Sequence, residues 1–342
     1  MRPKTPTTKY LERYAEPEVR QRLSLPRSYR TVACIPACDE ADNLPATLTR
    51  LAQAEGACDA LVVVVLNGRE GASERVHEAN QRTAQHLRGQ ADLPQDLMTH
   101  GTYRGMGLVL VDRFSTGQRL PHKQGVGMAR KIAADLALGW MADGRIERRW
   151  IRSTDADVRV PPDYWEQPGQ ARPGTAACVY PFKHLPEGDA LQRQALACYD
   201  AYLRYYVASL KRAGSAYAYA TIGSLLCLDA DAYAKVRGFP KKQAGEDFYI
   251  LNKLAKVGRI ETLSGAPLEL AGRTSDRVPF GTGVAVAQIQ TQLAQGQDYQ
   301  VYNPQIFDAL KAWLTVLDDA GEHGDIERFE EGLKTLPELV RT

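Results

Sequence analysis

Residues 150–157 read Trp150-Ile151-Arg152-Ser153-Thr154-Asp155-Ala156-Asp157. The pattern predicts a strand that ends in two carboxylates separated by one small residue. Hard divalent cations such as Mg²⁺ and Mn²⁺ take oxygen ligands, and they are often shared between protein carboxylates and substrate phosphates. Ala156 leaves room for a bulky ligand to approach the turn. The alternative is a polar loop after a strand, because Asp is common in turns.

The composition is that of an ordinary soluble globular protein. The chain has 342 residues, of which 44% are hydrophobic and 25% charged, and its formal net charge is +2. General nucleic-acid binders usually show a basic excess, so we expect no nucleic-acid partner. There is no run of about 18 apolar residues, so we expect no membrane span. Residues 1–9 lack the apolar core of a signal peptide.

The six cysteines form no Cys-x-x-Cys pair, and several lie in apolar, strand-like runs. Buried reduced thiols in a cytosolic protein are the simplest interpretation, so we expect a cytoplasmic location. Cys34 and Cys38 could bind zinc, but no matching second pair is evident.

Short apolar runs alternate with helical patterns along the chain. The strands are expected at 31–36, 60–66, 108–111, 150–153, 176–180, 222–228 and 268–270. The helices are expected around 44–51, 72–87, 127–141, 191–210 and 230–236, from 245 to about 258, and in the C-terminal remainder. The helix at 127–141 looks amphipathic. This alternation predicts an α/β domain with a largely parallel sheet.

The long helix at 191–210 carries an aromatic stripe formed by Tyr199, Tyr202 and Tyr206. Core packing is the favoured interpretation of this stripe. The alternative is contact with lipid or an acceptor, which leaves peripheral membrane contact open.

Polar residues follow three of the predicted strands, at Asp39-Glu40, Asn67-Gly68 and the Asp155 turn. Ligands of open parallel sheets bind outside the carboxyl ends of the strands. Carboxylates and an amide in that position suit a nucleobase and ribose. Loop solvation and helix capping explain Asp42 and Asn43 well, but they explain three strand ends less well.

The order of these motifs resembles the family 2 glycosyltransferases, which have the GT-A fold of the nucleotide-diphospho-sugar transferases. The family carries an Ile-Pro-Ala-x-x-Glu-type opening, an apolar strand ending in Asn or Asp, a Gly-x-x-x-Ala-Arg helix, an Asp-x-Asp motif and a Gly-Glu-Asp helix. The matching segments are, in order, Ile35-Pro36-Ala37-Cys38-Asp39-Glu40, Val65-Leu66-Asn67-Gly68, Gly125-Val126-Gly127-Met128-Ala129-Arg130, Asp155-Ala156-Asp157 and Gly245-Glu246-Asp247. Gly238-Phe239 also matches.

The resemblance implies a GT-A-type, Rossmann-like α/β domain at 30–283, whose mostly parallel sheet is flanked by helices. An N-terminal arm at 1–29 would precede it, and a helical C-terminal extension at 284–342 would follow.

The resemblance also implies a metal-dependent glycosyltransferase. It would move a sugar from a nucleotide-diphosphate donor, with a UDP-sugar favoured, to a hydroxyl of an unidentified glycan, lipid or small molecule, with inversion. Asp157 would ligate Mn²⁺ or Mg²⁺, and Asp155 would face the ribose or the metal. The metal neutralises charge on the departing diphosphate. Residues implied at the nucleoside or sugar are Pro36, Ala37, Asp39, Glu40, Asn67, Asp155 and Ala156.

In the same resemblance, Asp247 would be the general base that deprotonates the acceptor hydroxyl, with Glu246 positioning it or the acceptor. The alternative for Asp247 is a structural acid in the first turn of a helix. Lys123 and Arg130 flank a helix N-terminus, where backbone N–H groups favour anions, and either could bind the diphosphate. The alternative there is that Gly125 and Gly127 only allow a close helix–strand approach.

Two features depart from the family pattern. The second strand ends in Leu66 and Asn67 where an acid is common, and the only histidine after the Gly-Glu-Asp motif is His323. We therefore expect Arg273 or Arg277 to clamp the diphosphate in place of a metal-binding histidine, because arginine makes forked hydrogen bonds to phosphate. Asp276 could add a metal ligand. The alternative is a solvated surface loop.

Two other functions compete with glycosyl transfer. A sugar-nucleotide nucleotidyltransferase shares the topology, but it usually needs a Gly-rich, basic loop after the first strand, and here residues 36–43 are acidic and lack glycine. A non-catalytic carbohydrate-binding protein could keep the fold. The presence of Asp155, Asp157, Glu246 and Asp247 together argues against it.

Overall fold

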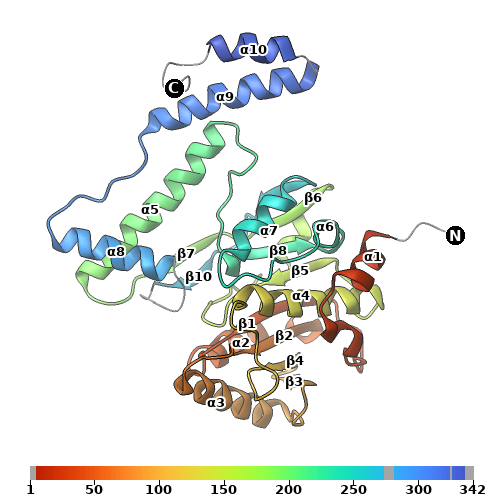
Figure 1. Cartoon of the computed structure of the whole chain (residues 1–342). Coiled ribbons are helices and arrows are strands. Elements are labelled where there is room, and N and C mark those ends of the chain that lie inside the picture. The colour runs from red at the N-terminus through yellow and green to blue at the C-terminus, as the bar shows by residue number, and fades with distance from the viewer. Residues whose placement is uncertain (1–4, 273–280, 324–325, 336–342) are drawn as a thin grey trace. The chain divides into compact units, whose positions relative to one another are not determined.

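The computed structural model describes residues 5–272, 281–323 and 326–335. Eight strands form one sheet, and their bounds are β1 (Thr31–Ala37), β2 (Ala60–Asn67), β3 (Met98–Tyr103), β4 (Met106–Arg113), β5 (Trp150–Ser153), β6 (Thr175–Val179), β8 (Leu226–Asp229) and β9 (Arg259–Thr262). The order across the sheet is β3-β4-β2-β1-β5-β8-β6-β9 (Figure 1). Strands β4, β2, β1 and β5 are mutually parallel, and β9 is parallel to β6.

Only β3 and β8 run against the others in this sheet. Strand β3 pairs antiparallel with β4, and β8 pairs antiparallel with both β5 and β6, so β6 runs in the direction of β5. Six of the eight strands therefore share one direction. The predicted α/β class with a mostly parallel sheet is confirmed.

The two central strands are fully buried. Every residue of β1 and of β2 is buried, as expected for apolar runs covered on both faces. Three strands were not predicted: β3, β9 and β7 (Phe182–Leu185). Strand β7 pairs in parallel with β10 (Leu268–Ala271) in a separate two-stranded sheet. The strand predicted at 222–228 is shorter, because a 3₁₀ turn at Gly223–Leu225 precedes β8.

The helices associated with the large sheet are α1 (Pro6–Arg13), α2 (Leu44–Gln53), α3 (Glu74–Ala91), α4 (Val126–Ala142), α6 (Ala230–Lys235) and α7 (Glu246–Leu254). Helix α4 packs on β1 and β2. Contrary to the amphipathic pattern expected at 127–141, 14 of its 17 residues are buried. The reason is that a second layer covers its outer side.

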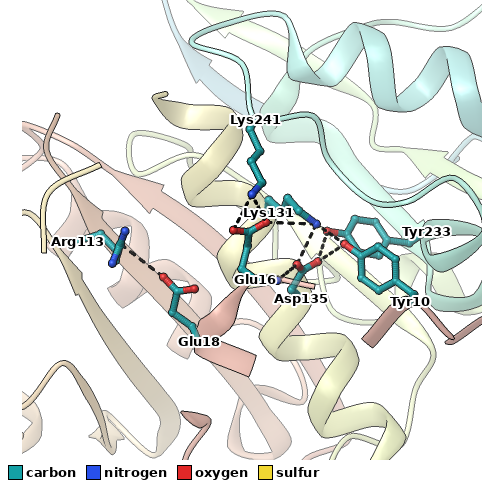
Figure 2. Close-up of polar contacts among 8 residues, drawn as sticks. All are labelled: Tyr10, Glu16, Glu18, Arg113, Lys131, Asp135, Tyr233 and Lys241. Carbon is teal, nitrogen blue, oxygen red and sulfur yellow. Dashed lines mark hydrogen bonds and ion pairs between the residues drawn. The ribbon is translucent and has the colours of Figure 1, made fainter. Parts of the chain in front are cut away.

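The N-terminal arm forms this second layer. Near the C-terminal end of α4, the Trp140 indole N–H donates to the Leu23 carbonyl at 2.9 Å, and Arg22 forms a forked ion pair with Asp143 at 2.7–2.9 Å. Near the middle of the helix, Asp135 is fully buried and is surrounded by donors from the arm and from α6 (Figure 2). The arm is therefore part of the packed structure of this unit.

The chain separates into two compact units. One holds both sheets and the helices above. The other contains Pro186–Ala220 and the C-terminal helices: α5 (Ala190–Arg212), α8 (Thr282–Ala294), α9 (Pro304–His323) and α10 (Ile326–Thr335). Its core is formed by Ala195, Leu196, Val286 and Ile289 of α5 and α8. Helix α5 therefore belongs with the C-terminal helices, which the order of the sequence does not reveal.

The aromatic stripe of α5 packs within this second unit. Tyr202 and Tyr206 stack on one another, and both rings contact Tyr302. The Tyr205 hydroxyl donates to the Tyr302 carbonyl at 2.7 Å. Part of the cluster stays accessible, since Tyr206 is 37% and Tyr302 50% exposed. Packing accounts for most of the stripe.

Candidate active site

The Asp155-Ala156-Asp157 turn follows β5 directly, at the carboxyl edge of the parallel strands. Helix α2 fixes the turn, because the Thr47 hydroxyl lies 2.8 Å from the Ala156 carbonyl and 3.0 Å from the Val158 carbonyl. Within the turn, Ala156 is buried, whereas Asp155 and Asp157 are partly exposed. The two carboxylates are thus presented on a rigid turn.

Arg130 connects this turn to α7. Its Nε donates to Glu246 Oε1 at 2.8 Å, one terminal nitrogen donates to Ser153 Oγ at 2.8 Å, and the other pairs with Asp155 Oδ1 at 2.5 Å. The side chain is only 3% exposed. The sequence makes Lys123 and Arg130 the two candidates for binding the diphosphate. The guanidinium of Arg130 is buried and engaged by three side chains.

The charges around Arg130 influence one another strongly. Burial opposes the charged guanidinium, yet Asp155 and Glu246 outweigh it and raise the pKa of Arg130 well above its usual value. Burial also raises the pKa of Asp155, which Arg130 lowers in part and the carboxylate of Asp157 raises further. The site is therefore a compact cluster in which acids outnumber the one buried cation.

Glu246 and Asp247 begin α7. The preceding Gly245 has a φ of 75°, a left-handed conformation that glycine adopts without strain. Asp247 Oδ1 accepts a 2.8 Å hydrogen bond from the Phe248 backbone N–H. Burial and the nearby Glu246 raise the pKa of Asp247 to about 6. An acid with this pKa is mostly ionised at neutral pH and can still accept a proton, as a general base requires.

Two aromatic residues stand beside Asp247 on the surface. Phe248 is 54% exposed and Tyr249 43%, and the Lys242 ammonium lies 3.8 Å from the centre of the Tyr249 ring. The apolar character of Phe248 gives no sign in the sequence that it faces solvent next to the candidate base.

Asn80 of α3 organises the loops that follow β1 and β2. Its side-chain oxygen accepts from the Asp39 backbone N–H at 3.0 Å, and its side-chain nitrogen donates to the Asn67 carbonyl at 2.9 Å. The residue is fully buried. Asn80 was missed in the sequence, since a lone Asn within a polar helical pattern gives no signal.

The other residues expected at the nucleoside lie at these two strand ends. Pro36 and Ala37 are buried in β1, and the Asn67 side-chain nitrogen donates to the Ala37 carbonyl at 3.0 Å. This nitrogen of Asn67 thus joins the two strands. Asp39 has a φ of 58° and pairs with Arg75 at 2.6 Å, and Glu40 accepts from the Asn43 side chain at 2.7 Å.

The segment before α4 provides the remaining cation candidate, Lys123, which is exposed. The helix start itself is covered: the Gly127 N–H donates to the Lys242 carbonyl at 3.2 Å, and a Cβ at Gly127 would lie 2.5 Å from the Pro240 carbonyl oxygen. The glycine thus permits a close approach, but to the loop before α7 and not to a strand. Arg273, Asp276 and Arg277 lie outside the described residues.

The carboxylates suit a divalent cation that substrate would help to hold. Within residues 5–272, 281–323 and 326–335, no group of three His, Cys, Asp or Glu side chains could hold a metal ion. Mg²⁺ usually binds through one or two carboxylates together with substrate phosphates and waters. Asp155 and Asp157 fit such a shared site, in which Oδ1 of Asp155 already pairs with Arg130.

A cavity of about 730 Å³ lies between α3 and the loop after β4. It is lined by Glu74, His77, Glu78, Gln81, Arg82, Phe114, Ser115, Thr116 and Arg119. None of the predicted site residues lines it. Phe114 and His77 of its lining lie beside Gly68, so the cavity borders the carboxyl end of β2 without reaching the predicted carboxylates.

No helix in the described part of the chain is long and apolar enough to cross a membrane.

The sequence matches no protein-family model and no curated protein. Solved structures do match in fold. One is that of S. aureus TarS in complex with UDP-GlcNAc, at 11% identity and a TM-score of 0.48, covering 91% of this chain and 82% of that one. Another is the mannosyltransferase PcManGT from Pyrobaculum calidifontis in complex with GDP-Man and Mn²⁺, at 16% identity and a TM-score of 0.44, covering 96% and 82%.

A third is the M. tuberculosis glucosyl-3-phosphoglycerate synthase, at 12% identity and a TM-score of 0.39, covering 80% of this chain and 82% of that one. All three TM-scores are below 0.5. The likenesses concern the arrangement of the backbone alone.

Proposed function

We propose that the protein is a metal-dependent glycosyltransferase that transfers a sugar from a nucleoside diphosphate sugar to a hydroxyl acceptor. One observation carries the proposal. A single buried guanidinium, that of Arg130, joins the Asp-x-Asp turn to the Gly-Glu-Asp helix start. A candidate metal site and a candidate base are therefore held in one cluster at the carboxyl edge of the sheet.

Each residue of the cluster has a role in this reaction. When bound, Mn²⁺ or Mg²⁺ would neutralise charge on the departing diphosphate, and Asp157 with Asp155 would hold it. The acceptor oxygen bonds to the anomeric carbon as the bond from that carbon to the diphosphate oxygen breaks, with inversion. Asp247 takes the hydroxyl proton, and its pKa of about 6 suits this at neutral pH. Glu246, bound to Arg130, positions Asp247.

The donor and acceptor lie on opposite sides of this cluster in the proposal. The loops after β1 and β2, joined by Asn80, would hold the nucleoside, and a UDP-sugar is favoured. Phe248 and Tyr249, both exposed beside Asp247, would contact the acceptor. Arg273 and Arg277 remain candidates for the diphosphate. A cytoplasmic location belongs to the proposal because the six cysteines are free thiols.

Thermal shift assays with nucleotides test the proposal, because a ligand that binds only the native state raises its stability. UDP, GDP, CDP, dTDP and ADP would each be added with Mn²⁺ and with EDTA, and the matching monophosphates serve as controls. We expect one diphosphate to raise the melting temperature with Mn²⁺ only, and the corresponding donor to be hydrolysed slowly.

Two results would contradict the proposal. Absence of a shift for every nucleotide, with and without metal, would remove the donor site. Exchange of pyrophosphate into a nucleoside triphosphate in the presence of a sugar phosphate would instead identify a nucleotidyltransferase.

A further inference from the structure

The loop at 237–245, between α6 and α7, leads directly into the candidate base. It contacts the start of α4 and the segment before that helix: the Gly127 N–H donates to the Lys242 carbonyl at 3.2 Å, and the Gln243 side chain donates to the His122 carbonyl at 3.0 Å. Gly125 packs against the Gln243 backbone. The position of this loop therefore fixes where α7 begins.

The N-terminal arm contacts the same loop from the other side. The Lys241 ammonium lies 2.8 Å from Glu16 Oε1 and 2.9 Å from Oε2 (Figure 2). Gly238, with a φ of 67°, has no space for a Cβ because the hydroxyls of Tyr10 and Tyr233 lie against it. Two residues of the loop thus contact the arm directly.

Glu16 is itself held firmly. Its side chain is 3% exposed, and its backbone N–H donates to Asp135 Oδ2 at 2.9 Å. Asp135 also accepts from the hydroxyls of Tyr10, at 2.5 Å, and Tyr233, at 2.7 Å, and pairs with Lys131 at 2.9 Å (Figure 2). Burial, followed by the nearby Asp135, raises the pKa of Tyr10 far above its usual range, so its hydroxyl remains a donor. The arm is therefore a rigid support.

Lys131 is the neighbour of Arg130 in α4, so one turn of this helix carries both clusters. Arg130 contacts Glu246 at the start of α7, while Lys131 contacts Asp135 and the arm. The loop at 237–245 spans the distance between the two clusters. Lys241 of the loop is fixed by its ion pair with Glu16, and Glu246, directly after the loop, is fixed by Arg130.

We infer that Glu16 acts through Lys241 as a positioning residue, holding the loop at 237–245 so that Glu246 stays on Arg130 and the first turn of α7 stays ordered. The arm is then a working part of the active site. Its kinetic consequence rests on the proposed glycosyl transfer, whereas the structural consequence does not.

The test compares substitutions at Lys241 with a control at the other end of α4. Lys241→Met keeps the aliphatic stem of a side chain that is 45% exposed and removes the ion pair. Lys241→Arg retains the charge. Arg22→Met removes the forked pair with Asp143, which also fixes the arm but lies far from α7 along α4. Glu16→Gln removes the same ion pair from the arm side.

Hydrogen exchange of the peptide 245–254 is the first measurement. In Lys241→Met and Glu16→Gln we expect the amides of Phe248 and Tyr249 to exchange on the order of tenfold faster, because the loop opens more easily. Lys241→Arg and Arg22→Met should exchange like the parent. Parental exchange in Lys241→Met, or equal acceleration in Arg22→Met, would overturn the inference.

Steady-state kinetics is the second measurement. We expect kcat to fall on the order of tenfold in Lys241→Met with the KM for the donor unchanged, because a small displacement of the base slows chemistry more than donor binding. Lys241→Arg should restore kcat. A parent enzyme without transferase activity would contradict the proposed function, and hydrogen exchange would then decide the positioning role alone.

Discussion

Arg130 Nε lies 2.8 Å from Oε1 of Glu246, and the two side chains are 3% and 4% exposed. They come from α4 and α7, whose sequence positions are 116 residues apart. Because the same guanidinium binds Ser153 and Asp155, three separate parts of the chain meet at one side chain. A buried cation that binds two acids and a hydroxyl is costly to disturb.

Arg130→Lys should strongly destabilise the fold. A lysine keeps the charge, but it cannot make the forked, planar set of bonds to Glu246, Ser153 and Asp155. A buried polar or charged acceptor that loses its donor costs roughly 1–3 kcal/mol or more, and one ammonium cannot serve all three acceptors. Urea unfolding monitored by circular dichroism would measure the loss.

Arg149→Lys is the matched control. Arg149 also binds two carboxylates, those of Asp229 and Asp231, but it is 59% exposed. Asp229 is only 10% exposed, but water can replace bonds of the exposed guanidinium, so the loss should stay on the scale of about 0–1 kcal/mol that exposed pairs show. Similar losses of unfolding free energy in the two variants would mean that burial does not increase the contribution of Arg130 to stability.

The rate of sugar transfer should depend on the ionisation of Asp247. With a pKa of about 6, Asp247 is mostly protonated at pH 5 and mostly ionised at pH 7, so kcat should rise across this interval and level off above it. Asp247→Asn should lower kcat by about 10²-fold or more and remove the rise. A variant that transfers sugar at the parental rate would make Asp247 structural.

The stability of the fold should also depend on the ionisation of Asp247, but in the opposite direction: ionisation raises kcat and lowers stability. The pKa of Asp247 is raised on folding, from an ordinary value of about 3.9 to about 6. The folded state therefore binds the proton more tightly, and this stabilisation is complete below about pH 4 and lost as the pH rises through about 6. Asp247→Asn has no such loss, so its melting temperature relative to the parent should increase from pH 4 to pH 8. Measurements with EDTA would separate this effect from metal binding, and a constant difference across pH would contradict it.

The sequence predicts the central strands of the fold because a continuous local run of apolar residues is enough to indicate that a strand is buried. Strands β1 and β2 are nearly continuous apolar runs, which is the pattern typical of parallel strands covered on both faces. Strand β9 was missed because its residues Arg259-Ile260-Glu261-Thr262 are partly exposed at the sheet edge and do not alternate clearly. An edge strand with polar residues resembles a loop in sequence.

The sequence predicts the motifs of the candidate site but not the side-chain contacts that join them. Asp155, Asp157, Glu246 and Asp247 carry recognisable spacings, so their types and order indicate the chemistry. Arg130 shows its charge but not its burial, and Tyr10 and Glu16 look like parts of a polar arm. Their roles depend on contacts between residues that lie more than 100 positions apart in the sequence, and local propensity and periodicity do not encode such contacts.

Binding of nucleoside diphosphate should require a divalent cation and Asp157. In the proposed site, Asp155 and Asp157 would supply part of the metal coordination and the diphosphate the rest. Neither the carboxylates nor the diphosphate alone is therefore expected to hold the metal well. Isothermal titration calorimetry should show binding with Mn²⁺ or Mg²⁺, none with EDTA, and none for Asp157→Ala. Asp59→Ala removes an exposed acid from the 3₁₀ turn before β2 and should bind like the parent. Unchanged affinity in EDTA would contradict the metal site.

Asn80→Ala should weaken nucleoside binding by releasing two loops at once. The amide of Asn80 is fully buried and accepts from Asp39 N–H while donating to the Asn67 carbonyl, so the substitution leaves both groups without their partner. Leaving buried polar groups unsatisfied costs roughly 1–3 kcal/mol each, and part of this cost should appear as lower stability. The rest should appear as weaker binding, because Asp39 would no longer be held in its left-handed conformation.

Paired measurements separate these two effects. Urea unfolding gives the loss of stability, and calorimetry with uridine and with UDP at conditions where the variant is fully folded gives the loss of affinity. Gln85→Ala, an exposed position on the same helix, is the control for changes in α3 itself. We expect uridine and UDP to lose affinity by similar factors in Asn80→Ala, because in the proposed site these loops hold the nucleoside and not the diphosphate. A variant that is less stable but binds uridine like the parent would show that Asn80 supports the fold without shaping the nucleoside site.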